Sequence, residues 1–554
     1  MLQSPQLHSG RANGCKLDDV NDIVSAGNSP GGDYDELPYI SLPIAFTQPS
    51  RLEALAKMHG LEVPHSEAAR VLELGCASGG NLIPLAARFP RCSFLGIDLA
   101  ERHVAEAKAR VRGLSLSNIE IRQGDLGEIS LEGEVFDYII CHGVFSWVPP
   151  AVQDAILNLC GTCLAPNGIA TISYNVLPGW HLRSIIRDIC VRHAPAGGQV
   201  RERVAKALAI INEVSKSADV SEPYGRAVRQ EAQRLARQPS SYILGEFLAP
   251  ENTPCHFRDF LHRVRASGLE YVCEGDLPSS IPAMFLPRAA KTIATMAGSD
   301  LISQQEYCDV ISGRTFRRSV LAKAANATRR REPTPNTRLE GLHIGAPLKL
   351  NNARSTNEKA VFSDHRGGAL ECRDSTVRLA YEMLGSAYPS TVPMDRLLSE
   401  CCGRPDGSKG SALLNRAAMR LLGQGRAMVS SLPLRAGIAA ADVPKIWPVA
   451  QSEAASGQPW VTSLKHTAVR TDAALRFAFA LMDGRTPQSE LKRRIETAMR
   501  SDEPSLRVSK SEDAQHHPNP NHQSASGSLL ARALSYAAAN ALLLPDTASR
   551  ASLT

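Results

Sequence analysis

A glycine-rich turn between a predicted buried strand and a helix is the segment best suited to bind a small molecule. The sequence VLELGCASGGNL occupies residues 71–82. Gly75 and Gly79 permit positive φ values and let a ligand approach the backbone closely. The following helix leaves its first N–H groups without intrahelical partners, so they can donate to a ligand. Nucleotide, flavin and S-adenosylmethionine sites all use turns of this kind.

Acidic residues around the turn favour a cationic ligand over a pyrophosphate. Asp98 ends the second predicted strand, 23 residues after Gly75, where a carboxylate can accept hydrogen bonds from both hydroxyls of a ribose. A dinucleotide site would also need G-x-G-x-x-G, which the Gly-x-Ala-x-Gly-Gly run from Gly75 does not match. Glu73 precedes the turn, where its charge would repel a pyrophosphate. S-adenosylmethionine, with a sulfonium and an α-amino group, suits this site better.

Two later strand ends complete the expected cofactor site. Gln123-Gly124-Asp125 ends the third strand, where a carboxylate can accept from the adenine amine, and His142-Gly143 ends the fourth, beside the expected methyl group. Helix capping is the alternative role of Asp98 and Asp125, and a local ion pair is that of Glu73. The predicted cofactor contacts are Glu73, Gly75, Cys76, Ala77, Gly79, Asn81, Asp98, Leu99, Gln123, Gly124, Asp125, His142 and Gly143.

Alternating strand and helix patterns are expected to hold these turns at one edge of a parallel sheet. We predict strands at 71–74, 93–98, 118–125, 136–143 and 168–175. We predict helices at 81–89, 100–111, 152–163 and 180–193. Because the carboxyl ends of parallel strands meet at one sheet edge, the four turns should converge there.

The 554 residues predict about three domains. The segments outside the expected cofactor-binding part are separated by composition and by helical periodicity. The predicted organisation is a disordered tail at 1–32, an α/β cofactor-binding domain at 33–198, a helical domain at 199–325, a linker at 326–374 and a mainly helical domain at 375–554 with a disordered loop at 501–528.

The turn at 71–82 resembles motif I of class I S-adenosylmethionine-dependent methyltransferases, although Ala77 stands where many members have Gly. Other segments are similar to one bacterial family, the methyltransferases that carry a methyltransferase regulatory domain. The N-terminal ones are DYDELPYISLPIAFTQPSRLEALA (33–56), CHGVFSWVPP (141–150), SYNVLPGWHLRSIIRD (173–188), YILGEFLAPENTPCHF (242–257) and HRVRASGLEYVCEGDLPS (262–279). The C-terminal ones are WVTSLKHTAVRTD (460–472) and LMDGRT (481–486).

The resemblance implies a Rossmann-like, seven-stranded α/β methyltransferase domain. A mainly helical regulatory domain and a helical C-terminal domain of winged-helix-like shape would follow it. The best-studied relatives are rickettsial-type protein-lysine methyltransferases that act on outer-membrane proteins. The domain order here is similar, which implies a protein-lysine acceptor.

Residues after the fourth and fifth strands are the candidates for the acceptor site. Methyl transfer from a sulfonium is an in-line displacement, so the enzyme mainly positions reactants and excludes water. A lysine amine, with a pKa of about 10.4, must first lose a proton. The predicted catalytic residues are His142, Trp147, Tyr174, Asn175, Trp180 and His181, with Phe145 as a further wall of the methyl site.

Some of these residues have simpler alternative roles. Trp147 and Trp180 would also suit a core or a domain interface, and His181 would suit the first turn of a helix. The segment with Tyr34, Tyr39, Phe46 and Thr47 is expected to cover the cofactor, with a surface strap as the alternative.

Charge favours a protein over a nucleic acid as the large partner. The chain has 62 Lys and Arg against 56 Asp and Glu, a net charge of +6, which is a small excess for a nucleic-acid binder. The fourth strand also lacks the [Asp/Asn/Ser]-Pro-Pro-aromatic tetrad of enzymes that methylate planar nitrogens.

Several observations predict a cytoplasmic protein without membrane insertion. No run of about 18 apolar residues is present, and no secretory signal is visible. The 13 scattered cysteines are typical of reduced thiols, and the isolated Cys160-x-x-Cys163 pair predicts no metal site.

We interpret the sequence as an S-adenosylmethionine-dependent methyltransferase that acts on lysine side chains of a protein. Two alternatives stay open. One is a small-molecule methyltransferase with accessory domains, and the other is a cofactor-binding regulatory protein without catalysis.

Overall fold

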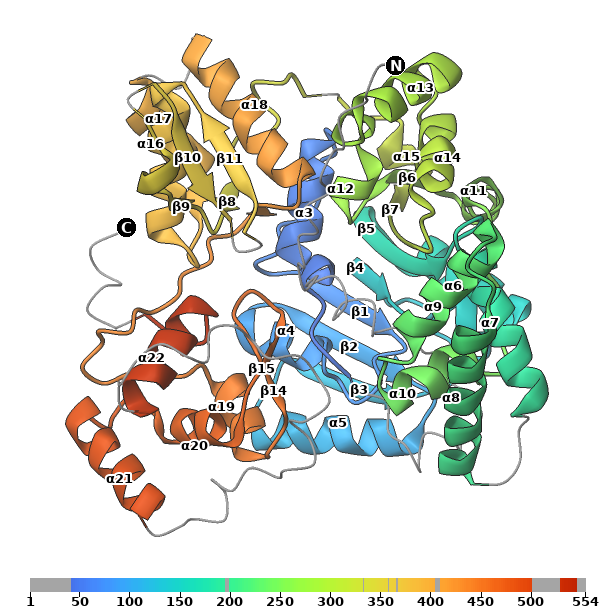
Figure 1. Cartoon of the computed structure of the whole chain (residues 1–554), viewed down its shortest axis with the longest axis horizontal. Coiled ribbons are helices and arrows are strands. Elements are labelled where there is room, and N and C mark those ends of the chain that lie inside the picture. The colour runs from blue at the N-terminus through green and yellow to red at the C-terminus, as the bar shows by residue number, and fades with distance from the viewer. Residues whose placement is uncertain are drawn as a thin grey trace, which may run out of the picture.

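The computed structural model describes residues 41–194, 199–331, 333–356, 358–364, 367–403, 409–500 and 529–545. The tail expected at 1–32 and the loop expected at 501–528 lie outside the described residues. Figure 1 shows one central sheet, with a mainly helical part beside it and two further parts formed by the C-terminal half of the chain.

A seven-stranded sheet in the order β3-β2-β1-β4-β5-β7-β6 organises the molecule. The neighbours among β1 to β5 pair in parallel, whereas β7 is antiparallel to both β5 and β6. β2 and β3 lie on one side of β1, and β4 and β5 lie on its other side. The strand order thus reverses between β1 and β4, which is where open α/β sheets generally bind ligands at the carboxyl ends of the strands. The strands are β1 (Arg70–Leu74), β2 (Ser93–Asp98), β3 (Ile119–Gln123), β4 (Phe136–Cys141), β5 (Leu164–Asn175), β6 (Leu269–Glu274) and β7 (Phe316–Lys323).

The first half of the sheet forms as the apolar runs predict. Val71, Leu72 and Leu74 of β1 are all fully buried, because helices cover both faces of a parallel sheet. The accompanying elements are η1 (Ala45–Thr47), α3 (Pro49–Met58), α4 (Leu82–Arg88), α5 (Glu101–Gly113), η2 (Phe145–Trp147), α6 (Pro150–Cys163) and α7 (Trp180–His193).

The segment 199–325 contains the expected helices and, in addition, two strands of the sheet. Both β6 and β7 come from this segment, so the sheet extends beyond the boundary predicted at residue 198. The helical elements are α8 (Val200–Ser217), α9 (Pro223–Leu235), α10 (Ser240–Tyr242), the π-helical turn η3 (Ile243–Phe247), α11 (Phe257–Ala266), α12 (Leu277–Ser280), η4 (Pro282–Met284), α13 (Pro287–Ala297), α14 (Leu301–Ser312) and α15 (Ala324–Ala327).

The prediction of a linker at 326–374 is wrong. The segment forms four short strands, of two to four residues each, which carry no periodic signal. They belong to two three-stranded sheets, β11-β10-β9 and β12-β8-β13. The elements of this part are β8 (His343–Gly345), β9 (Lys349–Leu350), η5 (Asn352–Arg354), β10 (Ala360–Ser363), β11 (Ala369–Cys372), α16 (Ser375–Ala387), β12 (Val392–Pro393), α17 (Met394–Cys402), α18 (Lys409–Gly423) and β13 (Met428–Ser430).

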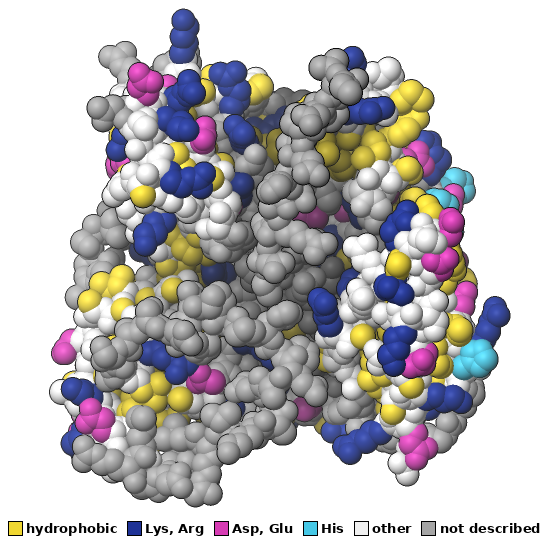
Figure 2. Space-filling model, in the orientation of Figure 1, with side chains coloured by type: hydrophobic (Ala, Val, Ile, Leu, Met, Phe, Trp, Pro, Cys, Tyr) yellow, Lys and Arg dark blue, Asp and Glu magenta, His cyan; other side chains and the backbone are white. Residues whose placement is uncertain are grey.

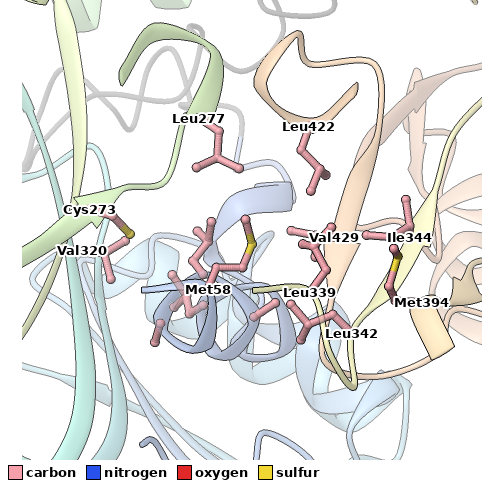
Figure 3. Close-up of a cluster of buried hydrophobic side chains, with 14 of the residues drawn as sticks. Met58, Cys273, Leu277, Val320, Leu339, Leu342, Ile344, Met394, Leu422 and Val429 are labelled. Carbon is pink, nitrogen blue, oxygen red and sulfur yellow. The ribbon is translucent and has the colours of Figure 1, made fainter. Parts of the chain in front are cut away.

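A continuous apolar core joins this part to the central sheet. Figure 3 shows Cys273 and Val320 of the sheet on one side, Met58 of α3 in the middle, and Ile344 and Val429 on the other side. Each of these side chains is at most 6% exposed. The short strands therefore form part of a packed unit with the sheet.

The C-terminal part has its own apolar core and a two-stranded hairpin. Its elements are α19 (Pro448–Ala455), β14 (Trp460–Thr462), β15 (Ala468–Arg470), α20 (Ala473–Leu481), α21 (Gln488–Arg500) and α22 (Leu529–Ala539). The turn between β14 and β15 contacts Asn81, the residue before α4. In the described ranges, no helix has both the length and the apolar character needed to cross a membrane.

A buried arginine holds the antiparallel edge of the sheet together. Arg317 of β7 is fully buried and donates to Glu274 of β6 at 2.6 Å. It also donates twice to Asp309 of α14, at 2.9 Å each. Its guanidinium carbon lies 3.8 Å from the centroid of the Phe257 ring on α11. One side chain thus ties β7 to three neighbouring elements.

We expect Arg317→Ala to lower the free energy of unfolding by about 3–5 kcal/mol, because Glu274 and Asp309 would stay buried without their counter-ion. Urea unfolding followed by circular dichroism measures the change. The matched control is Arg258→Ala, which removes an exposed pair with Glu306 and should leave the midpoint nearly unchanged. Equal shifts in the two variants would contradict this account of the edge.

Candidate active site

The glycine-rich turn after β1 adopts the conformation that its glycines predict. Gly75 and Gly79 have φ values of +74° and +76°, which only glycine adopts at little cost. A Cβ atom added at Gly75 would lie 2.3 Å from the Val144 side chain. Ala77 also has a positive φ, of +46°. The turn therefore accommodates the methyl side chain of Ala77 at a residue with a positive φ.

Asp98 at the end of β2 holds this turn in place by accepting hydrogen bonds from backbone N–H groups. Its Oδ2 accepts a hydrogen bond from the Ala77 N–H at 2.7 Å. Its Oδ1 accepts from the Ala100 N–H at 3.0 Å, at the start of α5. The carboxylate is 2% exposed. Its Oδ1 also lies 3.4 Å from His103 Nδ1. Since a carboxylate has about four acceptor positions, Asp98 still retains capacity for a ligand hydroxyl.

Glu73 is a buried carboxylate with one oxygen left over. Its Oε1 accepts from Asn81 Nδ2 at 2.7 Å, and its Oε2 has no hydrogen-bond partner among the described residues. Burial, reinforced by the negative charge of Asp98, raises the pKa of Glu73 to about 8, although the hydrogen bond from Asn81 opposes the shift. The local ion pair considered as an alternative is not the contact seen here.

The ends of β2 and β3 meet beside the turn. Gln123 Nε2 donates to the Leu99 carbonyl at 3.3 Å, and the Gly124 N–H donates to the Asp98 carbonyl at 3.0 Å. Asp125 is exposed, and its Oδ1 accepts from the Gly127 N–H at 2.8 Å. Asp125 thus stabilises its own turn, at the edge where the adenine is expected, and the described residues between it and β4 form no helix that it could cap.

The N-terminal segment packs directly on the glycine-rich turn. The Gly80 N–H donates to Ser41 Oγ at 2.8 Å. The Ile44 N–H donates to Asn81 Oδ1 at 3.0 Å. The Thr47 hydroxyl lies 3.0 Å from the same oxygen and 2.9 Å from the Ile44 carbonyl, so the two oxygens share its one proton. Tyr34 and Tyr39, which the sequence also assigned to this cover, lie outside the described residues.

His142 follows β4 and is enclosed by aromatic rings. Its ring lies edge-on to Phe46 at 5.1 Å and to Phe316 at 5.7 Å between centroids. Both ring nitrogens are buried, and neither has a hydrogen-bond partner within the part of the chain that the structure describes. Burial, with a smaller effect of Arg318, holds the pKa of His142 well below its usual 6.5. The imidazole is therefore neutral at physiological pH. The next residue, Gly143, donates from its N–H to Ser173 Oγ at 2.8 Å.

The two tryptophans of the predicted acceptor site contact each other. Trp147 and Trp180 lie edge-to-face with centroids 6.0 Å apart and form a small apolar cluster with Leu177 and Ala249. Trp180 Nε1 is buried and has no acceptor among the described residues. The guanidinium of Arg183 lies 5.1 Å from the centre of the Trp180 ring.

The remaining predicted catalytic residues have different environments. Tyr174 stacks on Phe260 at 3.9 Å, and its hydroxyl lies 3.2 Å from Ser319 Oγ, inside the core. Asn175 Nδ2 donates to Asn252 Oδ1 at 3.1 Å, whereas Asn175 Oδ1 is buried without a donor among the described residues. His181 lies in the first turn of α7 with an exposed side chain. Of the three, Asn175 has a free buried polar atom.

One residue of the site has no counterpart in the sequence predictions. His466, in the turn between β14 and β15, is 2% exposed, and its Nε2 lies 2.8 Å from Asn81 Oδ1. The C-terminal hairpin thus reaches the same carboxamide as Ile44 and Thr47. His466 lies within the segment 460–472, whose family resemblance was the available signal, but no spacing rule links it to residue 81.

Three family models match the chain, and they follow one another along it. A methyltransferase domain matches residues 71–168, a predicted methyltransferase regulatory domain matches 239–323, and the PKMT C-terminal winged helix domain matches 442–542. These matches agree with the order expected from the sequence.

The chain is also similar to individual proteins over most of its length. An uncharacterized protein of Rickettsia prowazekii is 31% identical over 491 residues, which cover 85% of this chain and 88% of the relative. The structure of PKMT2 from Rickettsia typhi in complex with AdoHcy has the same fold, with a TM-score of 0.77 and 22% identity, over 91% of this chain and all of PKMT2. Trans-aconitate 2-methyltransferase of Methylobacterium nodulans is 29% identical over 140 residues, 25% of this chain and 49% of that enzyme.

We expect Glu73→Gln to change how stability depends on pH. Because the folded pKa of Glu73, about 8, lies above its ordinary value of 4.5, the unfolded chain binds fewer protons between these limits. The contribution of Glu73 to stability is then full below pH 4.5 and is lost as the pH rises through 8. The melting temperature of Glu73→Gln, compared with that of the wild type, should therefore rise from pH 5 to pH 8. Parallel melting curves across this range would contradict the burial argument.

Proposed function

Since the chain belongs to the S-adenosylmethionine-dependent methyltransferases that carry a methyltransferase regulatory domain, we propose that it methylates lysine side chains of a protein. The observation that supports this acceptor most directly is the match to the PKMT C-terminal winged helix domain at 442–542. The similarity to PKMT2 supports it as well, because it extends over nearly the whole chain. The extra domains are what a large acceptor would require.

The buried carboxylates of the first two strand ends suit the cofactor. S-adenosylmethionine supplies an electrophilic methyl group on a sulfonium when it is bound. We assign the uncommitted Oε2 of Glu73 to its α-amino group and Asp98 to its ribose hydroxyls. The glycine-rich turn, Leu99, Gln123-Gly124-Asp125 and His142-Gly143 would form the remaining contacts.

The neutral state of His142 defines what this residue can do. Its low pKa means that it carries only one ring proton at neutral pH and keeps the other nitrogen as an acceptor. We therefore assign it to accept a hydrogen bond from an acceptor amine that is already neutral. The apolar surroundings disfavour a charged ammonium and so help to lower the pKa of the incoming lysine. The rings of Phe46 and Phe316 exclude water around the imidazole.

The other candidate residues support the acceptor side in different ways. Asn175 Oδ1, buried without a described donor, is suited to accept a hydrogen bond from the amine. Trp147 and Trp180 would line the path of the acceptor side chain, and the exposed His181 would lie near the entrance to that path. Tyr174, whose hydroxyl is engaged with Ser319, would act by fixing Phe260 and Phe145.

A protein acceptor also agrees with the surface charge. On the face that Figure 2 shows, basic and acidic side chains of the described residues are interspersed. A nucleic-acid site would gather basic side chains on one face. We also propose a cytoplasmic location and a division of the chain into a methyltransferase domain at 33–198, a regulatory domain at 199–325 that completes the sheet, and a C-terminal region from 326 onward that includes the two three-stranded sheets.

A small-molecule acceptor is the second candidate. The similarity to trans-aconitate 2-methyltransferase favours it, but this similarity is confined to a quarter of the chain. It therefore bears on the cofactor half of the site and leaves the accessory domains unexplained.

Asp98→Ala should weaken S-adenosylmethionine binding about 10- to 100-fold, which corresponds to the loss of hydrogen bonds to a charged group. Isothermal titration calorimetry measures the affinity. The control is Asp137→Ala, because Asp137 lies near the amino end of β4 and pairs with Arg70. Unchanged binding by Asp98→Ala would refute the proposed cofactor site.

Labelled S-adenosylmethionine, added with the protein to a bacterial lysate, should transfer its methyl group to precipitable protein. Hydrolysis of that protein should release the label as methyllysine. A lysate whose lysines have been acetylated should accept little label, because the acceptor nitrogen is blocked. Label found only in acid-soluble metabolites would favour the small-molecule alternative, and no transfer would favour a regulatory protein.

A further inference from the structure

The turn between β14 and β15, residues 463–467, belongs to the C-terminal domain but packs on the cofactor turn. His466 lies 2.8 Å from Asn81 through Nε2 and Oδ1. The two residues before it are also held by the methyltransferase domain: Gln48 Nε2 donates to the Lys465 carbonyl at 3.1 Å, and Arg88 Nη1 donates to the Leu464 carbonyl at 2.6 Å. The backbone of His466 has a φ of +60°, which is uncommon outside glycine and indicates a constrained position.

The backbone N–H of Ile44 determines which groups donate and which accept in these hydrogen bonds. The Ile44 N–H can only donate, so Asn81 must present its oxygen to Ile44 and its NH₂ group to Glu73. His466 Nε2 faces the same oxygen and must therefore carry a proton. Burial lowers the pKa of His466 to about 3, so the ring is neutral and its single N–H points to Asn81.

A second connection joins the C-terminal domain to the other end of the turn. Arg110 of α5 donates to the Ser78 carbonyl at 2.9 Å and to Glu453 Oε1 of α19 at 3.3 Å. Glu453 Oε2 accepts from the Thr462 N–H of β14 at 2.6 Å. The same hairpin thus supports Ser78 and Asn81, which flank Gly79 and Gly80.

We propose that the hairpin of the C-terminal domain is part of the cofactor site and that His466 is a positioning residue in it. By donating to Asn81, His466 fixes the carboxamide whose NH₂ group holds Glu73 Oε1, which leaves Glu73 Oε2 directed to the cofactor amine. This inference rests on the proposed role of Glu73. It predicts that affinity for S-adenosylmethionine depends on a residue nearly 400 positions away from the turn.

Three variants at one position separate the side chain from the backbone. His466→Gly removes the donor but suits the positive φ, so it should fold and bind S-adenosylmethionine about tenfold more weakly in calorimetry. His466→Gln retains an N–H donor and should recover most of the affinity. Lys465→Ala, a change in the same turn, should bind as the wild type does. Wild-type affinity of His466→Gly would overturn the proposal.

A double-mutant cycle tests whether His466 acts through Asn81. In an Asn81→Ala background, His466→Gly should weaken binding by less than twofold, because the acceptor of its hydrogen bond is gone. A full tenfold loss in that background would show that His466 acts by another route and would overturn the proposal.

The same titrations distinguish this inference from the proposed function. If Asp98→Ala weakens binding and His466→Gly does not, the cofactor site stands and the inference fails. If neither variant weakens binding, the proposed cofactor site itself is wrong. The acceptor does not enter these measurements, so an acceptor other than lysine leaves their outcome unchanged.

Discussion

The carboxamide of Asn81 is the constraint on which the arrangement of the site depends. It has one accepting oxygen and one donating NH₂ group, and both are buried. The oxygen lies within hydrogen-bonding distance of the Ile44 N–H and the Thr47 hydroxyl of the N-terminal segment and of His466 Nε2 of the C-terminal domain. The NH₂ group donates to Glu73. Three distant parts of the chain must therefore fold together before Glu73 is held as it is here. A methyltransferase domain alone would lack one of these partners.

The sequence predicted the parallel half of the sheet because continuous apolar runs mark strands that are buried on both faces. β2 agrees with its predicted limits, and the other early strands agree within a few residues. β7 was missed because two arginines, Arg317 and Arg318, follow its first residue. The pairing of Arg317 with Glu274 and Asp309 is what allows an arginine to be buried there. The strands at 343–372 were missed because pairing between distant short segments leaves no local pattern.

The predicted cofactor residues were those that a strand end fixes in place. Gly75, Asp98 and Gln123 lie at successive strand ends of one sheet, so their spacing along the chain already implied that they converge. His466 could not be found in this way, since its contact with Asn81 spans 385 positions. The acceptor side was also less predictable, because Tyr174 and Asn175 are adjacent in β5 and point to opposite faces of the sheet. Adjacent residues of one motif therefore have different environments.

The charges around the turn explain why a cationic ligand is needed to complete it. Glu73 and Asp98 are both buried, and the charge of Asp98 contributes to the raised pKa of Glu73. Two histidines near the turn supply no positive charge, because burial keeps His142 and His466 neutral. A third, His103, lies 3.4 Å from Asp98 Oδ1 through its Nδ1. A bound ammonium would lower the free-energy cost of ionising Glu73, and the ionised carboxylate would in turn stabilise the ammonium. In the proposed site, binding of the cofactor amine and ionisation of Glu73 are thus coupled, and the strength of the coupling depends on the orientation that Asn81 imposes on the carboxylate.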